Sequence, residues 1–316
     1  MADKIKLGIS TCLLGEKVRY DGGHKLDRYL VNVVGPFVEW VPICPEVESG
    51  LPIPRESMHL VQTDNGLRLM TGKTKIDHTE RMITWAEKRL DLLEKEEICG
   101  FVFKTKSPSS GMRDIKIYSE AGMPLSKGKG MFASRLMERF PYLPVEDEGR
   151  LNDAGLRENF IERVFVYFRW LQFLANGSTR KGLVDFHTDH KYLIMAHSES
   201  NLRAMGKLVA DPHAKEKKEL LDEYFINLME GLKLNATVKK NTNVLQHIMG
   251  YFKNQLSSEE KQELLDVIEK YHNRLIPLIV PVTLIKHYTK KYREPYLSRQ
   301  HYLNPHPVEL MLRNHV

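Results

Sequence analysis

Three short apolar runs near the start of the chain each adjoin a loop and carry a cysteine at or near one end. The clearest spans residues 99–111, where Cys-Gly-Phe-Val-Phe is typical of a buried strand and Lys-Thr-Lys-Ser-Pro-Ser-Ser-Gly is typical of a tight loop. The others are residues 6–10, followed by Cys12, and residues 38–43, followed by Cys44. Ligands bind where strands of an open α/β sheet lead into loops. The pattern therefore predicts a sheet with a binding site at one edge.

Further elements alternate with these strands over the first half of the chain. Residues 61–70 resemble a hairpin around Asp-Asn-Gly, and residues 115–118 are a possible fourth strand. Residues 76–97 and 128–140 have helical spacing of apolar side chains. We therefore expect an α/β domain with a mainly parallel sheet over residues 1–148.

The second half has a different pattern. Prolines and acidic residues at 141–149 indicate an inter-domain linker. Helices are expected at residues 152–174, 183–197, 200–208, 215–232, 242–252 and 257–275. Pro277 and Pro281 interrupt the next apolar run, and residues 296–316 are expected to be mostly irregular. An all-α domain over residues 149–316 follows.

The composition excludes several classes of protein. Of 316 residues, 42% are hydrophobic and 28% charged, which is typical of a soluble globular protein. No apolar run is long enough for a membrane span, and the N-terminus lacks a signal-peptide pattern, so we expect a cytoplasmic protein. Three cysteines argue against a disulfide framework. Buried thiols, a reactive thiol or a metal site remain open.

The cysteines permit two interpretations. Free cysteines are usually buried as small apolar side chains. Alternatively, thiolates of Cys12, Cys44 and Cys99 could hold a soft metal or an iron–sulfur cluster with one open iron. Their positions beside strand–loop junctions favour the second interpretation.

Polar residues near these cysteines are candidates for chemistry. Glu46 follows Cys44 closely enough to act as a general base, and Ser107 or Ser109 could donate a proton or bind a base edge. Arg19 and Asp21 form a possible substrate clamp, and each of these groups could equally be an ordinary surface loop.

Positive charge is concentrated in the second half. Residues 1–150 hold 23 Lys and Arg against 22 Asp and Glu, whereas the remainder holds 24 against 19. Residues 286–293 interleave bases with aromatics, as RNA-binding segments do. The RNA-binding candidates are Lys239, Lys240, Lys286, Lys290, Lys291 and Arg293. A solvated helix face is the alternative, and His187 with His190 could form half of a metal site.

These motifs resemble a known family. Residues 8–22, 41–46 and 103–109 resemble the thiouracil desulfidase (TudS) family, and residues from about 149 onward resemble the YbgA-type helical domain. Together they resemble the RudS-type fusion, which is a tRNA 4-thiouridine desulfidase. The resemblance implies a 4Fe–4S cluster held by three cysteines, whose fourth iron takes the sulfur from a thiolated pyrimidine.

The third cluster ligand departs from the family pattern. Many members have Cys after Ser-Pro-Ser, where this chain has Ser110. A three-thiolate cluster here requires Cys99, although an extended run from residue 99 to 110 spans about 35 Å. If Cys99 is remote, Ser110 or an external ligand must take its place.

The resemblance implies a cluster-dependent desulfidase that acts on 4-thiouridine in tRNA, with Cys12, Cys44 and Cys99 as ligands. Glu46 would activate water, Ser107 or Ser109 would act on the base, and Arg19, Asp21 and Lys104 would hold the substrate. One alternative is a desulfidase of free thiouracil or thiouridine monophosphate. Another is a non-enzymatic iron–sulfur RNA-binding sensor.

Overall fold

The computed structural model describes residues 4–211 and 215–315, so Met1–Asp3 of the N-terminal run and Val316 of the tail lie outside the described residues. The chain divides into two compact units, Met1–Asn152 and Asp153–Val316. Within the described ranges, no helix is long and apolar enough to cross a membrane.

The first unit is built on a four-stranded parallel sheet. Its strands are β1 (Ile5–Ser10), β2 (Val38–Ile43), β5 (Phe101–Phe103) and β8 (Val145–Asp147), in the order β2-β1-β5-β8. Leu7, Ile9, Phe101 and Phe103 are completely buried, as expected for the central strands of a parallel sheet covered on both faces. The expected fold class is confirmed.

A second sheet holds the expected hairpin and the expected fourth strand. It consists of β3 (Met58–Thr63), β4 (Gly66–Thr71), β6 (Ile115–Ser119) and β7 (Pro124–Gly128), in the order β4-β3-β6-β7. Only β3 and β6 pair in parallel. Residues 115–118 therefore form a strand, but one that lies in a separate mixed sheet.

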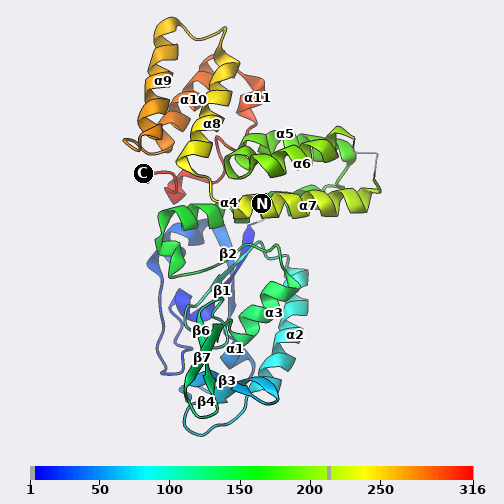
Figure 1. Ribbon diagram of the computed structural model, residues 1–316, viewed down its shortest axis with the longest axis vertical. Helices are drawn as coiled ribbons and strands as arrows, with labels where there is room; N and C mark the ends of the chain where they lie inside the picture. Colours follow the sequence, from blue (N-terminus) through cyan, green and yellow to red (C-terminus); the bar gives the residue numbers. More distant parts are fainter. Residues whose placement is uncertain (1–3, 212–214, 316) are drawn as a thin grey trace. The chain divides into compact units, whose positions relative to one another are not determined.

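Three helices complete this unit: α1 (Pro45–Glu48), α2 (Thr79–Glu96) and α3 (Met131–Arg139). Figure 1 shows α2 and α3 side by side, where Trp85 of α2 contacts Phe132 of α3 with ring centroids 5.2 Å apart. Phe132 also meets Phe101 edge-on at 6.0 Å, so α3 is packed against the parallel sheet.

The prediction of an inter-domain linker at residues 141–149 is wrong. Val145–Asp147 forms β8, which pairs with β5 along its whole length. The acidic residues suggested a solvated segment, but Glu146 and Asp147 are buried because Arg150 and Arg113 pair with them. The boundary between the units lies after this strand, at Asn152.

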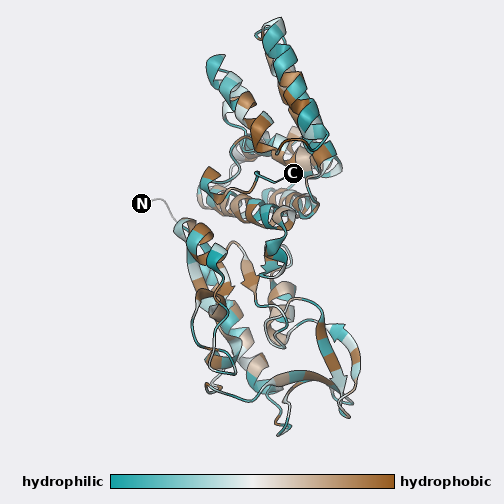
Figure 2. Ribbon diagram, turned by 90° about the vertical axis from the view of Figure 1, so that its left-hand side faces the viewer, coloured by the Kyte–Doolittle hydropathy of each residue, from teal (hydrophilic) through white to brown (hydrophobic). Residues whose placement is uncertain are grey.

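The second unit is helical. Its helices are α4 (Ala154–Ala175), α5 (Arg180–His197), α6 (Glu199–Ala210), α7 (Lys217–Lys233), α8 (Val238–Met249), α9 (Ser258–His272), α10 (Ile279–Lys291) and α11 (Pro295–Ser298). Hydrophobic and hydrophilic segments alternate along these helices (Figure 2), as expected when each buries one stripe. Pro281 does not interrupt α10, because it lies in the first turn, where no backbone donor is required.

Buried polar groups of the second unit satisfy one another. Glu162 accepts hydrogen bonds from Arg313 at 2.8 Å and from His197 at 3.1 Å. Burial by itself would raise the pKa of Glu162, but Arg313 and His197 outweigh it and lower the pKa to about 2. His187 bonds to Tyr224, and His190 bonds to a backbone carbonyl, so both histidines have structural roles.

Candidate functional site

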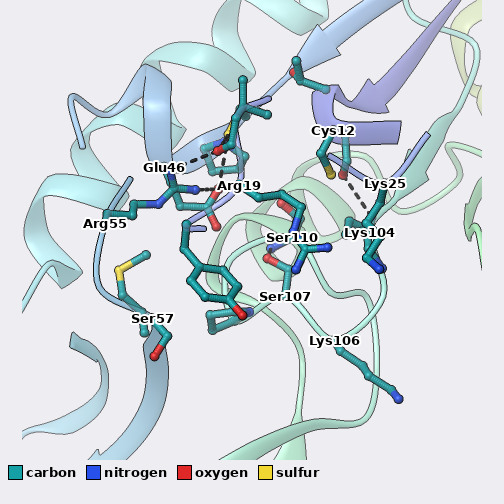
Figure 3. Close-up of a pocket in the computed structure, with 18 of the residues that line it drawn as sticks. Cys12, Arg19, Lys25, Glu46, Arg55, Ser57, Lys104, Lys106, Ser107 and Ser110 are labelled. Carbon is teal, nitrogen blue, oxygen red and sulfur yellow. Dashed lines mark hydrogen bonds and ion pairs between the residues drawn. The ribbon is translucent and has the colours of Figure 1, made fainter. Parts of the chain in front are cut away.

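A pocket of about 450 Å³ lies at the carboxyl edge of the parallel sheet in the first unit. Residues that follow β1, β2 and β5 line it, as the strand–loop pattern of the sequence predicts. Figure 3 shows Cys12 on one side of this pocket and Glu46 with Arg55 on the other, with Ser107 and Ser110 between them. We call it the thiol pocket.

Two of the three cysteines meet in the thiol pocket. Ser10 of β1 pairs with Ile43 of β2, so Cys12 and Cys44 leave adjacent strands that lie about 4.8 Å apart. Both thiols line the pocket, and both side chains are buried. Burial raises the pKa of Cys12 to about 11 and, together with nearby Glu46, raises that of Cys44 to about 12. Both are therefore protonated at neutral pH when no cation is bound.

The prediction that Cys99 is the third cluster ligand is wrong. Its backbone N–H donates to the carbonyl of Lys6, at the start of β1, whereas Cys12 follows the end of β1. The four residue steps from Lys6 to Ser10 alone span about 13 Å in a strand. Metal–sulfur bonds are about 2.3 Å long, so one cluster cannot bind Cys99 together with Cys12. Cys99 is a buried core side chain at the opposite end of the sheet.

Ser110 is a candidate third ligand in the thiol pocket. It is 4% exposed and lines the pocket with Cys12 and Cys44. No group of three His, Cys, Asp or Glu side chains in the described part of the chain could hold a metal ion. The pocket therefore does not fit a cluster held by three thiolates. Its lining offers the thiols of Cys12 and Cys44 and the hydroxyl of Ser110 as candidate ligands.

The serine loop is fixed by the start of α3. The backbone N–H groups of Met131 and Phe132 donate to the carbonyls of Pro108 and Ser109, at 3.0 and 2.9 Å. A side chain at Gly130 would lie 2.5 Å from the Ser109 carbonyl oxygen, so only glycine permits this approach. The loop is thereby held rigidly against the pocket.

A hydrogen-bonded chain connects this loop to Glu46. Ser109 donates to Glu46 Oε1 at 2.7 Å, and the hydroxyls of Ser109 and Ser107 are 2.9 Å apart. Ser107 lines the pocket, whereas Ser109 is completely buried behind it. Arg55 holds the other carboxylate oxygen at 3.9 Å, and the Cys44 thiol donates to that oxygen at 3.6 Å. Glu46 is therefore positioned to exchange protons with groups in the pocket.

The predicted substrate-holding residues are only partly brought together. Arg19 and Lys104 line the pocket, and Lys104 forms an ion pair with Glu148. Asp21 is exposed, does not line the pocket, and accepts the N–H of Gly23 at 3.0 Å. Its carboxylate is 3.6 Å from Arg19, so Asp21 can orient Arg19 without touching a ligand.

The predicted RNA-binding cations do not form one uniform surface. Lys240 donates to the backbone carbonyls of His197 and Asn235, and Lys291 pairs with Glu260. Lys239 and Lys290 are exposed on α8 and α10. Lys286 lines a separate cavity, and Arg293 lies in a turn with a positive φ of 53°. Their role in RNA binding stays a prediction.

Several pocket residues escaped sequence reasoning. Arg55 lines the pocket and lies in the Pro-rich segment after β2. Glu148, which follows β8, does not line the pocket but pairs with Lys104, which does. Tyr20 and Lys25 line the mouth of the pocket beside Arg19. Only the position of Tyr20 within the Arg-Tyr-Asp-Gly turn gave a signal that could have identified it.

The chain is similar to known proteins over each of its halves. Residues 7–148 match the family model described as 2-thiouracil desulfurase, and residues 191–307 match the model described as a protein of unknown function, DUF1722. The uncharacterized protein YbgA of Escherichia coli strain K12 is 33% identical over 168 residues, which cover 52% of this chain and 98% of YbgA.

Among solved structures, the 4Fe-4S-dependent thiouracil desulfidase TudS is 30% identical, with a TM-score of 0.38. The match covers 47% of this chain and 94% of TudS. The chain therefore belongs to the family of YbgA, and it carries a TudS-type domain of the 2-thiouracil desulfurase family fused to its YbgA-type domain.

Proposed function

We propose that this protein removes the sulfur of a thiolated pyrimidine by hydrolysis and that 4-thiouridine in tRNA is its substrate. The observation that carries the proposal is the thiol pocket, which is lined by Cys12, Cys44 and Glu46, with Glu46 hydrogen-bonded to Ser109. This pocket lies in the part of the chain that matches the 2-thiouracil desulfurase family model. The chain is also 30% identical to TudS, a 4Fe-4S-dependent thiouracil desulfidase, and this identity supports the same chemistry.

Cys12, Cys44 and Ser110 are the residues that would hold the cluster. When bound, a cluster with one open iron supplies a Lewis acid that accepts the sulfur of the substrate. The Cys44 thiol must lose its proton to bind iron, and Glu46, at 3.6 Å, is placed to accept that proton.

Glu46 is the group that activates water. Its carboxylate removes a proton from a water molecule, and the water oxygen forms a bond to the carbon that carries the sulfur. The carbon–sulfur bond then breaks, the carbonyl forms, and sulfur leaves as hydrosulfide. Ser107 and Ser109 return the proton from Glu46 toward the pocket. The net reaction consumes one water and releases hydrogen sulfide, so no external reductant is required.

Positive charge at the pocket mouth supports a nucleotide over a free base. Arg19, Lys25 and Lys106 are among the residues that line the pocket, and each can contact a phosphate. The pocket volume of about 450 Å³ exceeds the space that a single pyrimidine ring fills. The basic excess of residues 151–316 favours a polyanionic substrate such as tRNA. A 4-thiouridine buried in folded tRNA would have to be extruded into the pocket.

Anaerobic reconstitution of the full chain with iron and sulfide tests the proposal. We expect loss of the near-ultraviolet absorbance of 4-thiouridine in tRNA and release of sulfide. Thiouridine monophosphate serves as the comparison substrate, and equal rates on it would assign the reaction to free nucleotides. Intact 4-thiouridine in the presence of a fully reconstituted cluster would contradict the desulfidase proposal.

A further inference from the structure

A second cavity, of about 420 Å³, lies entirely within the helical unit. Side chains of α4 and α10 and the segment of residues 303–314 enclose it. Its walls are largely apolar, with contributions from Phe165, Val282 and Leu303. We call it the tail cavity. Its size is within the range of small-molecule sites, which run from about 300 to 1,000 Å³.

The charged side chains that line the tail cavity are all cationic. Arg169, Lys286, His306 and Arg313 line it, and no Asp or Glu is among the described residues of the lining. Arg313 is neutralised from behind by Glu158 and Glu162, which lie outside the lining. Arg169 and Lys286 form no ion pair with any carboxylate in the described part of the chain, so the cavity keeps an excess of positive charge.

Arg169 is a partly buried cation with one shielded nitrogen. One of its terminal nitrogens donates to the Pro305 carbonyl, while the other, Nη1, is shielded from solvent and has no hydrogen-bond partner among the described residues. Burial lowers the pKa of this guanidinium to about 10, against the opposing influence of Glu162. A buried donor without a partner is costly, so a ligand that accepts its hydrogen bond would be stabilising.

His306 adds a second shielded nitrogen. Its Nε2 is buried without a partner among the residues described, and its ring meets Phe165 edge-on at 6.4 Å. Arg169 lies over the same Phe165 ring at 6.0 Å. Because His306 Nδ1 donates to the Pro307 carbonyl, its Nε2 is an acceptor in the neutral ring. The shielded Arg169 donor and this shielded nitrogen both lie beside the Phe165 ring, and small side-chain rotations of the kind seen on ligand binding would expose them.

We propose that the tail cavity binds a phosphate monoester carried on an apolar or aromatic body, such as an aryl or nucleoside phosphate. The unpaired Nη1 of Arg169 and the charge of Lys286 suit a phosphate, which carries more charge and more acceptor oxygens than a single carboxylate. Apolar walls beside Phe165 suit a flat body. The proposal does not depend on the desulfidase activity of the first unit.

Calorimetric titration of the full chain with phenyl phosphate tests this site. We expect saturable one-to-one binding that is weaker for inorganic phosphate, which lacks the apolar body. Lys286→Met removes an exposed charge and should weaken binding by about fivefold. Arg169→Met should weaken it by about thirtyfold, provided that its circular dichroism matches that of the unchanged protein.

Two controls make the result decisive. Lys270→Met removes an exposed lysine of α9 outside the cavity and should leave binding unchanged. Benzoate tests whether any aromatic anion is accepted. The proposal would be overturned by absence of saturable binding, by equal affinity for benzoate, or by binding that Arg19→Met weakens and Lys286→Met does not.

Discussion

Cys12 and Cys44 resemble Cys99 in burial and in the direction of their pKa shifts but lie at the opposite edge of the same sheet. All three side chains are buried, and burial raises the pKa of each thiol, to about 11 or 12. Cys12 and Cys44 follow the ends of β1 and β2, whereas Cys99 precedes the start of β5. Because the strands are parallel, position relative to the strand decides which edge a residue occupies. Strand direction thus separates ligand candidates from core residues.

The largest expected effect comes from removing one thiol at each edge. Cys12→Ala should abolish iron binding after anaerobic reconstitution, because the thiol pocket then keeps a single thiolate. Cys99→Ala should retain the iron and sulfide content of the unchanged protein, at a cost of about 1 kcal/mol in the free energy of unfolding. Iron and acid-labile sulfide analysis measures both. Loss of iron in folded Cys99→Ala protein would show that Cys99 is a ligand and that the two edges of the sheet do not differ in this way.

Glu46 provides the next test, because it belongs to the same edge but not to the ligand set. Glu46→Gln keeps the hydrogen bond from Ser109 but removes the base, so the turnover rate should fall about a hundredfold. Iron content after complete reconstitution should not change, because water can take the Cys44 proton more slowly when Glu46 is replaced. Glu39→Gln is the matched control, since Glu39 is exposed on β2. A variant of Glu46 with undiminished turnover would exclude Glu46 as the base.

Some residues at the carboxyl edge of the parallel sheet are placed by local sequence patterns and others by how distant segments fold together. Only the first kind can be predicted from the sequence. Local sequence patterns predict the limits of the strand at 38–43 and the burial of the strand after Cys99. They also predict the chemical roles that Glu46 and Ser107 could have. The prediction that Cys99 is a ligand is wrong because it relies on the number of cysteines in the chain. It does not consider that Cys99 lies at the start of a strand, whereas Cys12 and Cys44 follow strand ends. Arg55 could not be predicted, because its approach to Glu46 depends on how the loop after β2 folds back.

Ser110 offers a way to sharpen the comparison by gain of function. Ser110→Cys adds a third thiol to the edge that already holds Cys12 and Cys44. Iron binds thiolate more strongly than a serine oxygen in such sites, so the variant should lose iron to a chelator more slowly. Ser107→Cys, in the same loop, is the control and should give a smaller improvement. If Ser110→Cys loses iron at the original rate, Ser110 is not a ligand position.

The smallest expected effect is the slow chemical modification of Cys99. In the metal-free protein, iodoacetamide should modify Cys12 and Cys44, which line the pocket, before Cys99, which is 1% exposed. Burial raises the pKa of Cys99 to about 12, so its reactive thiolate is scarce at neutral pH and increases about tenfold for each unit of rising pH. Mass spectrometry of peptides measures the order of modification. In urea all three thiols should react alike, because that order reflects the fold; if Cys99 reacted first in the native protein, its assignment to the core would be wrong.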